Sequence, residues 1–245
     1  MPGQVSVEER EVTEQSDWPH DDPRGTPRAD LEQIEVDRAE TEKGHSRIQL
    51  ILKGSLDLVG SVLALVLLAP LWLLIALMIK LDSPGPVLFR QPRIGRNGEQ
   101  FGMLKFRTMI KEADARKLEI LHLNEAADGL FKIEHDPRIT RFGRFLRSTS
   151  LDELPQLLHV LSGRMSLVGP RPLIPEEDAQ IEGEHRRRLQ MRPGMTGAWQ
   201  VAGASRIPIS ELVELDADYV SDWSLLLDLR LLIGTLPHVI RRRGM

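Results

Sequence analysis

The sequence predicts a mixed α/β, helix-rich protein with one membrane-inserted helix, and three observations support this fold class. Residues 58–79 form a run of 22 residues without a charged side chain. Short runs with strand composition lie on both sides of a glycine-rich turn at residues 95–98. Apolar clusters recur at residues 223–227 and 229–233 near the C-terminus. We therefore expect an N-terminal tail (residues 1–45), a membrane helix (residues 46–82) and a folded domain (residues 83–245).

Composition narrows the class further. The 245 residues include no cysteine, which excludes a disulfide scaffold, a thiol nucleophile and a cysteine zinc site. Residues 1–45 carry thirteen acidic and five basic residues with few aromatics, so we expect this acidic tail to be disordered. The rest of the chain is mildly basic, which suits anionic lipids or phosphates. No nucleic-acid recognition motif is present, so we expect no nucleic-acid partner.

The apolar run is long enough to cross a membrane but has features of a helix that turns back. A straight helix over residues 58–79 would measure about 33 Å, against about 30 Å of hydrocarbon. Pro70 removes a backbone hydrogen bond inside the run and predicts a kink. Both flanks are basic, and the positive-inside rule expects such residues on one side of the membrane. A re-entrant hairpin satisfies both flanks, and a single-pass anchor is the alternative. The flanking residues are Arg47 and Lys53 before the run, and Lys80, Arg90, Arg93 and Arg96 after it.

The segment after the apolar run predicts a hairpin and then helices. Residues 87–91 read as a strand, and residues 101–109 are expected to pair with it across the turn. Residues 111–124 look helical. Between residues 136 and 147 an arginine recurs every third position, which on a helix forms one cationic stripe. Such a stripe is either a phosphate or lipid-headgroup surface or a solvated helix face.

An acidic pair marks the start of the next predicted helix, which should end near Gly163. A capping box between Ser150 and Glu153 is one possible start. A start near Asp152 is the better one, because it keeps Pro155 in the first turn, where proline is tolerated. Asp152 and Glu153 then lie at the positive end of the helix dipole, which favours their ionised forms.

Two rigid turns follow, and the chain ends in apolar helices. Proline on both sides of Arg171 restricts the backbone around one guanidinium, a forked donor that suits phosphate. The second turn, at residues 193–197, precedes a predicted strand at residues 198–201. Residues 216–245 are expected to form either amphipathic helices in the membrane interface or core helices of the domain.

Several of these motifs occur together, in order, in one known family. The motifs are Lys-Phe-Arg-Thr-Met at residues 105–109, Ser-Leu-Asp-Glu-Leu-Pro-Gln at 150–156, Ser-Leu-Val-Gly-Pro-Arg-Pro at 166–172 and Pro-Gly-Met-Thr-Gly at 193–197. From about Lys53 to Arg243 the chain resembles the bacterial sugar transferases, the monotopic phosphoglycosyl transferases of exopolysaccharide initiation. The resemblance implies a re-entrant membrane helix, a small catalytic domain and interfacial amphipathic helices. The chain departs from the family at the helix break, where Ala69-Pro70 replaces Ser-Pro.

The resemblance also implies a reaction. A UDP-sugar, with glucose or galactose favoured, reacts with undecaprenyl phosphate to give UMP and a lipid-linked diphosphosugar. By similarity Asp152 is the nucleophile, forms an aspartyl-phosphosugar and holds Mg²⁺, while Glu153 assists. Arg171, Lys105 and Arg147 are the candidates for binding substrate phosphate, with structural ion pairs as the alternative for the last two.

The remaining implications concern location and partners. Asp216 matches a family acid near the site. The expected location is the cytosolic face of a bacterial inner membrane, where a lipid phosphate meets a soluble nucleotide sugar; a homo-oligomer is compatible with it. Two rival functions remain: a non-catalytic scaffold that recruits assembly proteins, and a glycosyltransferase that releases a nucleoside diphosphate.

Overall fold

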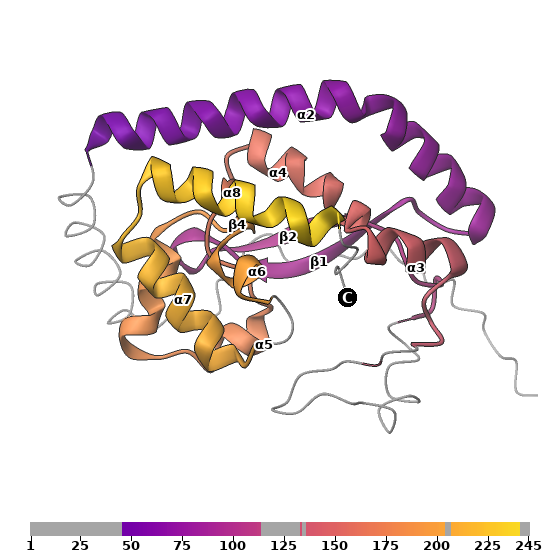
Figure 1. The fold of residues 1–245 in the computed structure, drawn as a ribbon. Helices are drawn as coiled ribbons and strands as arrows, with labels where there is room; N and C mark the ends of the chain where they lie inside the picture. Colours follow the sequence, from indigo (N-terminus) through magenta and orange to yellow (C-terminus); the bar gives the residue numbers. More distant parts are fainter. Residues whose placement is uncertain (1–45, 114–132, 134–135, 204–206, 241–245) are drawn as a thin grey trace, which may run out of the picture.

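The computed structural model describes residues 46–113, 133, 136–203 and 207–240. The acidic tail, most of the helix predicted at residues 111–124 and the end of the C-terminal segment lie outside these residues. The described chain folds into two small sheets surrounded by helices, with the long helix α2 lying along one side (Figure 1).

Helix α2 (Arg47–Asp82) agrees with the helix expected at residues 46–82 and extends beyond the apolar run of residues 58–79 at both ends. Ser46 caps its N-terminus by accepting a hydrogen bond from the backbone N–H of Ile48 at 3.3 Å. Among the described residues it is the one helix long and apolar enough to cross a membrane, with a mean hydropathy of 2.9 over its most apolar window. Pro70 lies inside it, and Figure 1 shows a long arm and a shorter arm that runs in a different direction. The kink predicted from Pro70 is therefore a bend within one continuous helix.

The predicted hairpin is confirmed. Strands β1 (Leu88–Ile94) and β2 (Gln100–Phe106) pair antiparallel. The turn between them contains the short helix η1 (Arg96–Gly98), in which Asn97 and Gly98 take left-handed backbone angles, with φ of 58° and 78°. Asparagine and glycine are the residues that tolerate this region best, which explains the turn.

A second sheet lies next to the turn around Arg171 and corrects the second predicted turn, because residues 194–196 form a strand. Strand β3 (Ser166–Val168) pairs in parallel with β4 (Gly194–Thr196). A Cβ on Gly169 would lie 2.3 Å from the carbonyl oxygen of Arg192, so glycine is required for this close approach. The strand predicted at residues 198–201 is wrong, because these residues form helix α6 (Ala198–Ala202) and the pairing strand lies just before it.

The remaining elements are short helices that cover the sheets, plus two longer C-terminal helices. They are α3 (Arg141–Ser148), η4 (Leu151–Gln156), α4 (Leu157–Leu161), α5 (Pro175–Asp178), η5 (Gly183–Gln190), α7 (Ile209–Ser221) and α8 (Leu225–Ile240).

Two local predictions around α3 and η4 need correction. Arg138 lies before α3, is buried, and forms an ion pair with Asp136 at 2.7 Å, so it cannot belong to an exposed cationic stripe. Ser150 forms no capping hydrogen bond and has a φ of 56°, so the capping box is wrong. The alternative start near Asp152 is confirmed within one residue, and Gly163, with φ of 73°, follows the end of α4.

The shorter arm of α2 is part of the domain core. Ile75 and Ile79 are 2% exposed and pack with Phe106 and Leu146. Trp72 meets the ring of Phe106 edge-on, with centroids 5.2 Å apart. The hairpin and α3 therefore hold this arm by apolar packing.

The longer arm of α2 is held by buried charges instead. Lys53 forms an ion pair with Asp228 of α8 at 2.6 Å and donates to the carbonyl of Val168 at 3.0 Å. Asp57 accepts hydrogen bonds from the Ser166 hydroxyl at 2.8 Å and the Leu167 N–H at 3.0 Å. Lys53, predicted as part of a basic flank, is thus neutralised within the fold.

Helix α8 has one face in the core and one face outside. Asp228 and Leu231 are buried, and Asp228 also accepts hydrogen bonds from Tyr219 and Trp223. Its opposite face exposes the apolar side chains Leu226, Leu229, Ile233 and Leu236. The buried face fits the interpretation of this segment as a core helix, and membrane contact of the exposed apolar face stays a prediction.

We predict that Asp228→Leu lowers the unfolding free energy by about 3–5 kcal/mol, because it leaves Lys53 buried without an anion. Thermal unfolding of the detergent-purified protein measures the loss. The double variant Lys53→Met/Asp228→Leu should recover much of it, since no buried charge remains. Arg230→Ala, on the exposed face of α8, is the control. Equal stability of Asp228→Leu and this control would contradict the role of the ion pair.

Candidate active site

Helix η4 presents the acidic pair, and Asp152 is its unpaired member. Asp152 is 9% exposed. Within the described chain no other side chain donates a hydrogen bond to its carboxylate. The left-handed backbone of Ser150, a conformation that costs a non-glycine residue energy, begins this turn. A buried carboxylate without a direct partner needs a nearby cation or a proton.

Glu153 is already paired. The Lys105 ammonium, at the end of β2, lies 2.7 Å from its carboxylate. Burial alone would raise the pKa of Glu153, but the charge and hydrogen bond of Lys105 bring it below its ordinary value. Glu153 is therefore ionised at neutral pH, and Lys105 forms the structural ion pair that was one of its two predicted roles.

The pKa of Asp152 is raised to about 6 by burial and by the negative charge of Glu153. Lys105 and Arg147 oppose this rise. Asp152 is thus mostly ionised at neutral pH, yet it is more basic than an exposed aspartate. Such a carboxylate is suited to react as a base or a nucleophile.

The Lys-Phe-Arg-Thr-Met motif has a structural explanation at each of its first four positions. Lys105 pairs with Glu153, and Phe106 packs under α2. Arg107 donates to the carbonyl oxygens of Ser83 and Pro84, which fixes the turn after the membrane helix. Thr108 accepts from Nε of Arg147 at 2.9 Å. This strand end therefore joins helix α2 and the turn that follows it to the acidic pair.

Arg147 is held close to the acidic pair. Burial lowers its pKa, and the negative charges of Asp152 and Asp136 act in the opposite direction. The hydrogen bond to Thr108 fixes its guanidinium by one nitrogen only. Arg147 is therefore a cation beside Asp152 that retains further N–H donors.

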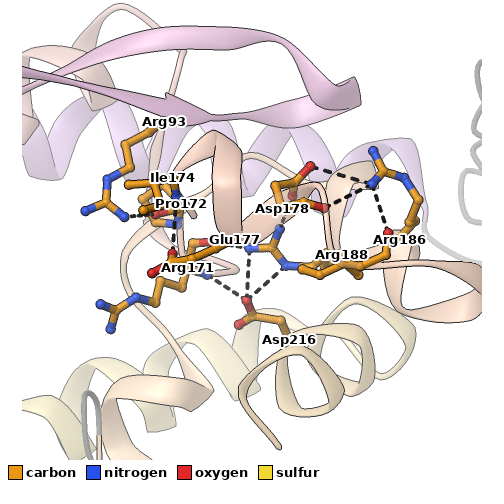
Figure 2. Close-up of polar contacts among 10 residues, drawn as sticks. Arg93, Arg171, Pro172, Ile174, Glu177, Asp178, Arg186, Arg188 and Asp216 are labelled. Carbon is orange, nitrogen blue, oxygen red and sulfur yellow. Dashed lines mark hydrogen bonds and ion pairs between the residues drawn. The ribbon is translucent and has the colours of Figure 1, made fainter. Parts of the chain in front are cut away.

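Arg171 is fixed by its backbone, which leaves its guanidinium available. Its N–H donates to Asp216 at 2.9 Å, and its guanidinium carbon lies 4.8 Å from the ring centre of Trp199. Figure 2 shows this guanidinium pointing away from the buried network behind it. Within the described chain it forms no ion pair with a carboxylate.

Asp216 belongs to the network behind the Arg171 loop (Figure 2). It is 0% exposed and accepts from Arg188 at 3.4 Å as well as from the Arg171 N–H. Arg188 also pairs with Asp178 at 3.0 Å and donates to the Arg171 carbonyl. Burial raises the pKa of Asp216 to about 6, against the effect of Arg188. The network fixes both backbone groups of Arg171, so Asp216 is a positioning residue.

The described residues offer a metal ion a carboxylate rather than a complete set of protein ligands. No group of three or more potential metal-binding His, Asp or Glu side chains occurs in the described part of the chain. Mg²⁺ is commonly held by one or two carboxylates together with substrate phosphates. The unpaired carboxylate of Asp152 is chemically suited to that arrangement.

Sequence reasoning placed Asp152, Glu153, Lys105 and Arg147 in one site, and the structure brings them together. It missed the burial of Arg188, because a run of three arginines at residues 186–188 looks like solvated charge. It also gave Arg93 no role beyond a basic flank. Trp199, beneath Arg171, carried no signal except its place after the second rigid turn.

We predict that Asp152→Asn stabilises the protein above pH 6. The folded-state pKa of Asp152, about 6, exceeds the ordinary 3.8, so its contribution to stability is present at low pH and is lost as the pH rises through 6. Removing the charge should gain up to about 3 kcal/mol at pH 7.5.

Thermal unfolding between pH 4.5 and 8 tests this prediction, with the exposed Asp218→Asn as control. A stability difference between Asp152→Asn and wild type that stays constant over this range would contradict it.

Comparison with known proteins identifies the family. The sequence model of the bacterial sugar transferases matches residues 48–242. The chain is 40% identical to galactosyl transferase CpsE of Streptococcus agalactiae, over 80% of this chain and 43% of that protein. It is 41% identical to the exopolysaccharide production protein ExoY of Sinorhizobium fredii, over 79% of this chain and 88% of that protein. It is 44% identical to the UDP-glucose:undecaprenyl-phosphate glucose-1-phosphate transferase of Caulobacter vibrioides, over 77% of this chain and 69% of that protein. It thus spans about two fifths of CpsE but most of ExoY. The chain belongs to the bacterial sugar transferase family.

Proposed function

We propose that the chain transfers a sugar 1-phosphate from a UDP-sugar to undecaprenyl phosphate and releases UMP, as a first membrane step in exopolysaccharide synthesis. The observation that carries this proposal is the unpaired, buried carboxylate of Asp152 between cations and beside a membrane helix. The names of the relatives support it, since they include a galactosyl transferase and a glucose-1-phosphate transferase. Glucose and galactose are therefore the donors to test first.

The reaction has two displacements at one phosphorus atom. A carboxylate oxygen of Asp152 attacks the phosphorus that bears the sugar, and the bond from that phosphorus to the oxygen of UMP breaks. UMP leaves with the bonding electrons, and Asp152 carries the phosphosugar as an acyl phosphate. An oxygen of undecaprenyl phosphate then attacks the same phosphorus, and the Asp152 carboxylate is released. The raised pKa of Asp152 favours the attack, because basicity and nucleophilicity rise together.

The surrounding cations have separate tasks in this proposal. Arg147 balances charge beside Asp152, and Arg171 presents free donors to donor phosphate. Lys105 keeps Glu153 ionised and in place. Asp152 would hold Mg²⁺ together with substrate phosphate, and the ion would supply charge neutralisation at the diphosphate.

The two arms of α2 support a re-entrant helix over a single span. Lys53 and Asp57 in the longer arm contact β3 and α8, while Ile75 and Ile79 in the shorter arm contact the hairpin and α3. Both arms therefore dock on the same polar domain, and a domain can occupy only one side of a membrane. We propose that α2 bends at Pro70 and that the domain lies on the cytosolic face of the inner membrane.

An apolar surface continues from α2 onto the neighbouring helices. Phe145 of α3, Leu158 and Leu161 of α4, and the outer face of α8 are all exposed. Exposed apolar side chains on helices that flank a membrane helix suit contact with lipid. This surface would hold Asp152 at the depth of a lipid phosphate.

We predict that cysteines introduced at Arg47 and Glu99 react with an impermeant thiol reagent from the same side. The chain has no native cysteine, so each label reports one position. Both should be protected in intact cells and labelled in inverted membrane vesicles, while Leu67→Cys should stay unlabelled in both. Labelling of Arg47→Cys in intact cells, with Glu99→Cys protected, would contradict the re-entrant topology.

We predict that Asp152→Asn and Asp152→Ala each lower transfer by at least about 10³-fold, since no other group replaces the nucleophile. Purified protein, a UDP-sugar and undecaprenyl phosphate are incubated, and nucleotide and lipid products are quantified. Asp218→Asn should keep wild-type activity.

The nucleotide product separates the rival functions in the same assay. UMP release supports the proposal. UDP release would indicate a glycosyltransferase, and no nucleotide release with any donor would favour the scaffold. Full activity of Asp152→Asn would refute the assigned nucleophile.

A further inference from the structure

A second arginine lies close to Arg171 and has donor capacity that the protein does not use. Arg93 of β1 donates from one terminal nitrogen to the carbonyl of Pro172 and from the other to the side-chain oxygen of Gln91, each at 2.9 Å. Its Nε is buried and has no hydrogen-bond partner among the described residues. A buried N–H without a partner costs about 1–3 kcal/mol, so a ligand that accepts from it would be bound favourably.

Arg171 presents a second guanidinium with unused donors. Its ring contact with Trp199 leaves its N–H edges unpaired within the described chain. In Figure 2 the guanidinium groups of Arg93 and Arg171 lie on the same side of the loop. Both are directed away from the network of Arg188, Asp178 and Asp216.

The two guanidinium groups repel each other across this space. Burial lowers the pKa of Arg93 to about 10, and the charge of Arg171 is the next largest cause. Glu177 and Glu153 only partly offset this effect. These acids have their own partners, because Glu177 accepts from the Ile174 N–H at 3.3 Å and Glu153 pairs with Lys105.

Hydrogen bonds to the backbone of the Arg171 loop hold Arg93 and Arg171 close together despite their repulsion. Asp216 and Arg188 fix the N–H and the carbonyl of Arg171, and the carbonyl of Pro172 fixes Arg93. Among the described residues neither guanidinium forms an ion pair with a carboxylate, and two cations held together in this way form a preorganised site for an anion. Guanidinium groups favour phosphate oxygens, to which they donate paired hydrogen bonds.

We propose that Arg93 is a substrate-binding residue that acts with Arg171 on the diphosphate of the nucleotide-sugar donor, with Nε of Arg93 donating to a phosphate oxygen. This inference rests on the proposed function for the identity of the ligand. It adds a residue of β1 to a site otherwise made from η4, the end of β2, Arg147 of α3 and the Arg171 loop. The rival role of Arg93 is positioning only, through the carbonyl of Pro172.

Calorimetric titration of the full-length protein with UDP in the presence of Mg²⁺ tests the proposal without turnover. Arg93→Gln should raise the Kd for UDP about 10- to 100-fold, the loss expected for a charge-assisted hydrogen bond. Arg93→Lys should fall between Arg93→Gln and wild type, because it keeps the charge but lacks the Nε donor. Arg90→Gln, on the exposed part of the same strand, should bind as wild type does.

Other outcomes separate the rival readings. Unchanged UDP affinity in both Arg93 variants, or no UDP binding by wild type, would overturn the proposal. Lower stability and kcat with unchanged UDP affinity would assign Arg93 to positioning alone. If wild type binds UDP through Arg93 but releases no UMP from any UDP-sugar, the proposed function fails and the binding site stands. Thermal unfolding of each variant confirms that the fold is intact, and Arg93→Lys remains informative if Arg93→Gln does not fold.

Discussion

The docking of α2 onto the polar domain depends on charges buried at the helix's longer arm. Lys53 and Asp228 are 175 positions apart in the chain, and their ion pair joins the membrane helix to α8. Asp57 bonds β3, which leads directly into the Arg171 loop. A buried ion pair is costly unless its remaining hydrogen bonds are satisfied, and here Tyr219, Trp223 and the Val168 carbonyl satisfy them. Because these contacts need one geometry, they fix the longer arm of α2 relative to β3 and α8.

The ion pair of Lys105 with Glu153 also explains why the carboxylate of Asp152 is left without a side-chain partner. Lys105 neutralises Glu153, so Asp152 is the acid without a partner, and burial keeps its pKa high. The Arg171 loop is fixed by its backbone groups through Asp216 and Arg188, which leaves the guanidinium free. In both places the supporting groups have hydrogen-bond partners, and the group that we propose to act on substrate is left without a side-chain hydrogen-bond partner among the described residues. The cost in stability is the usual price of a preorganised site.

Features with a local signal could be predicted from the sequence. Pro70 inside the apolar run, the glycine-rich hairpin turn and the proline pair around Arg171 each determine nearby backbone, and the structure shows a bent helix, the hairpin and a fixed loop. The acidic pair was likewise placed at a helix start. Arg138 and Lys53 were interpreted as surface or flank charges, and Arg188 was given no role, because the burial of all three depends on partners that no local pattern reveals. The prediction of a strand at residues 198–201 was wrong, because β3 pairs with the three residues before Gly197 and residues 198–202 form a helix.

Direct detection of the covalent intermediate tests the central claim, that Asp152 is the nucleophile. Purified protein is mixed with UDP-glucose or UDP-galactose without undecaprenyl phosphate, quenched in acid, and analysed by peptide mass spectrometry. If Asp152 is the nucleophile, a hexose-phosphate adduct forms on Asp152, disappears when undecaprenyl phosphate is added and never forms in Asp152→Asn. Formation of lipid-linked product without any such adduct, or an adduct on another residue, would contradict it.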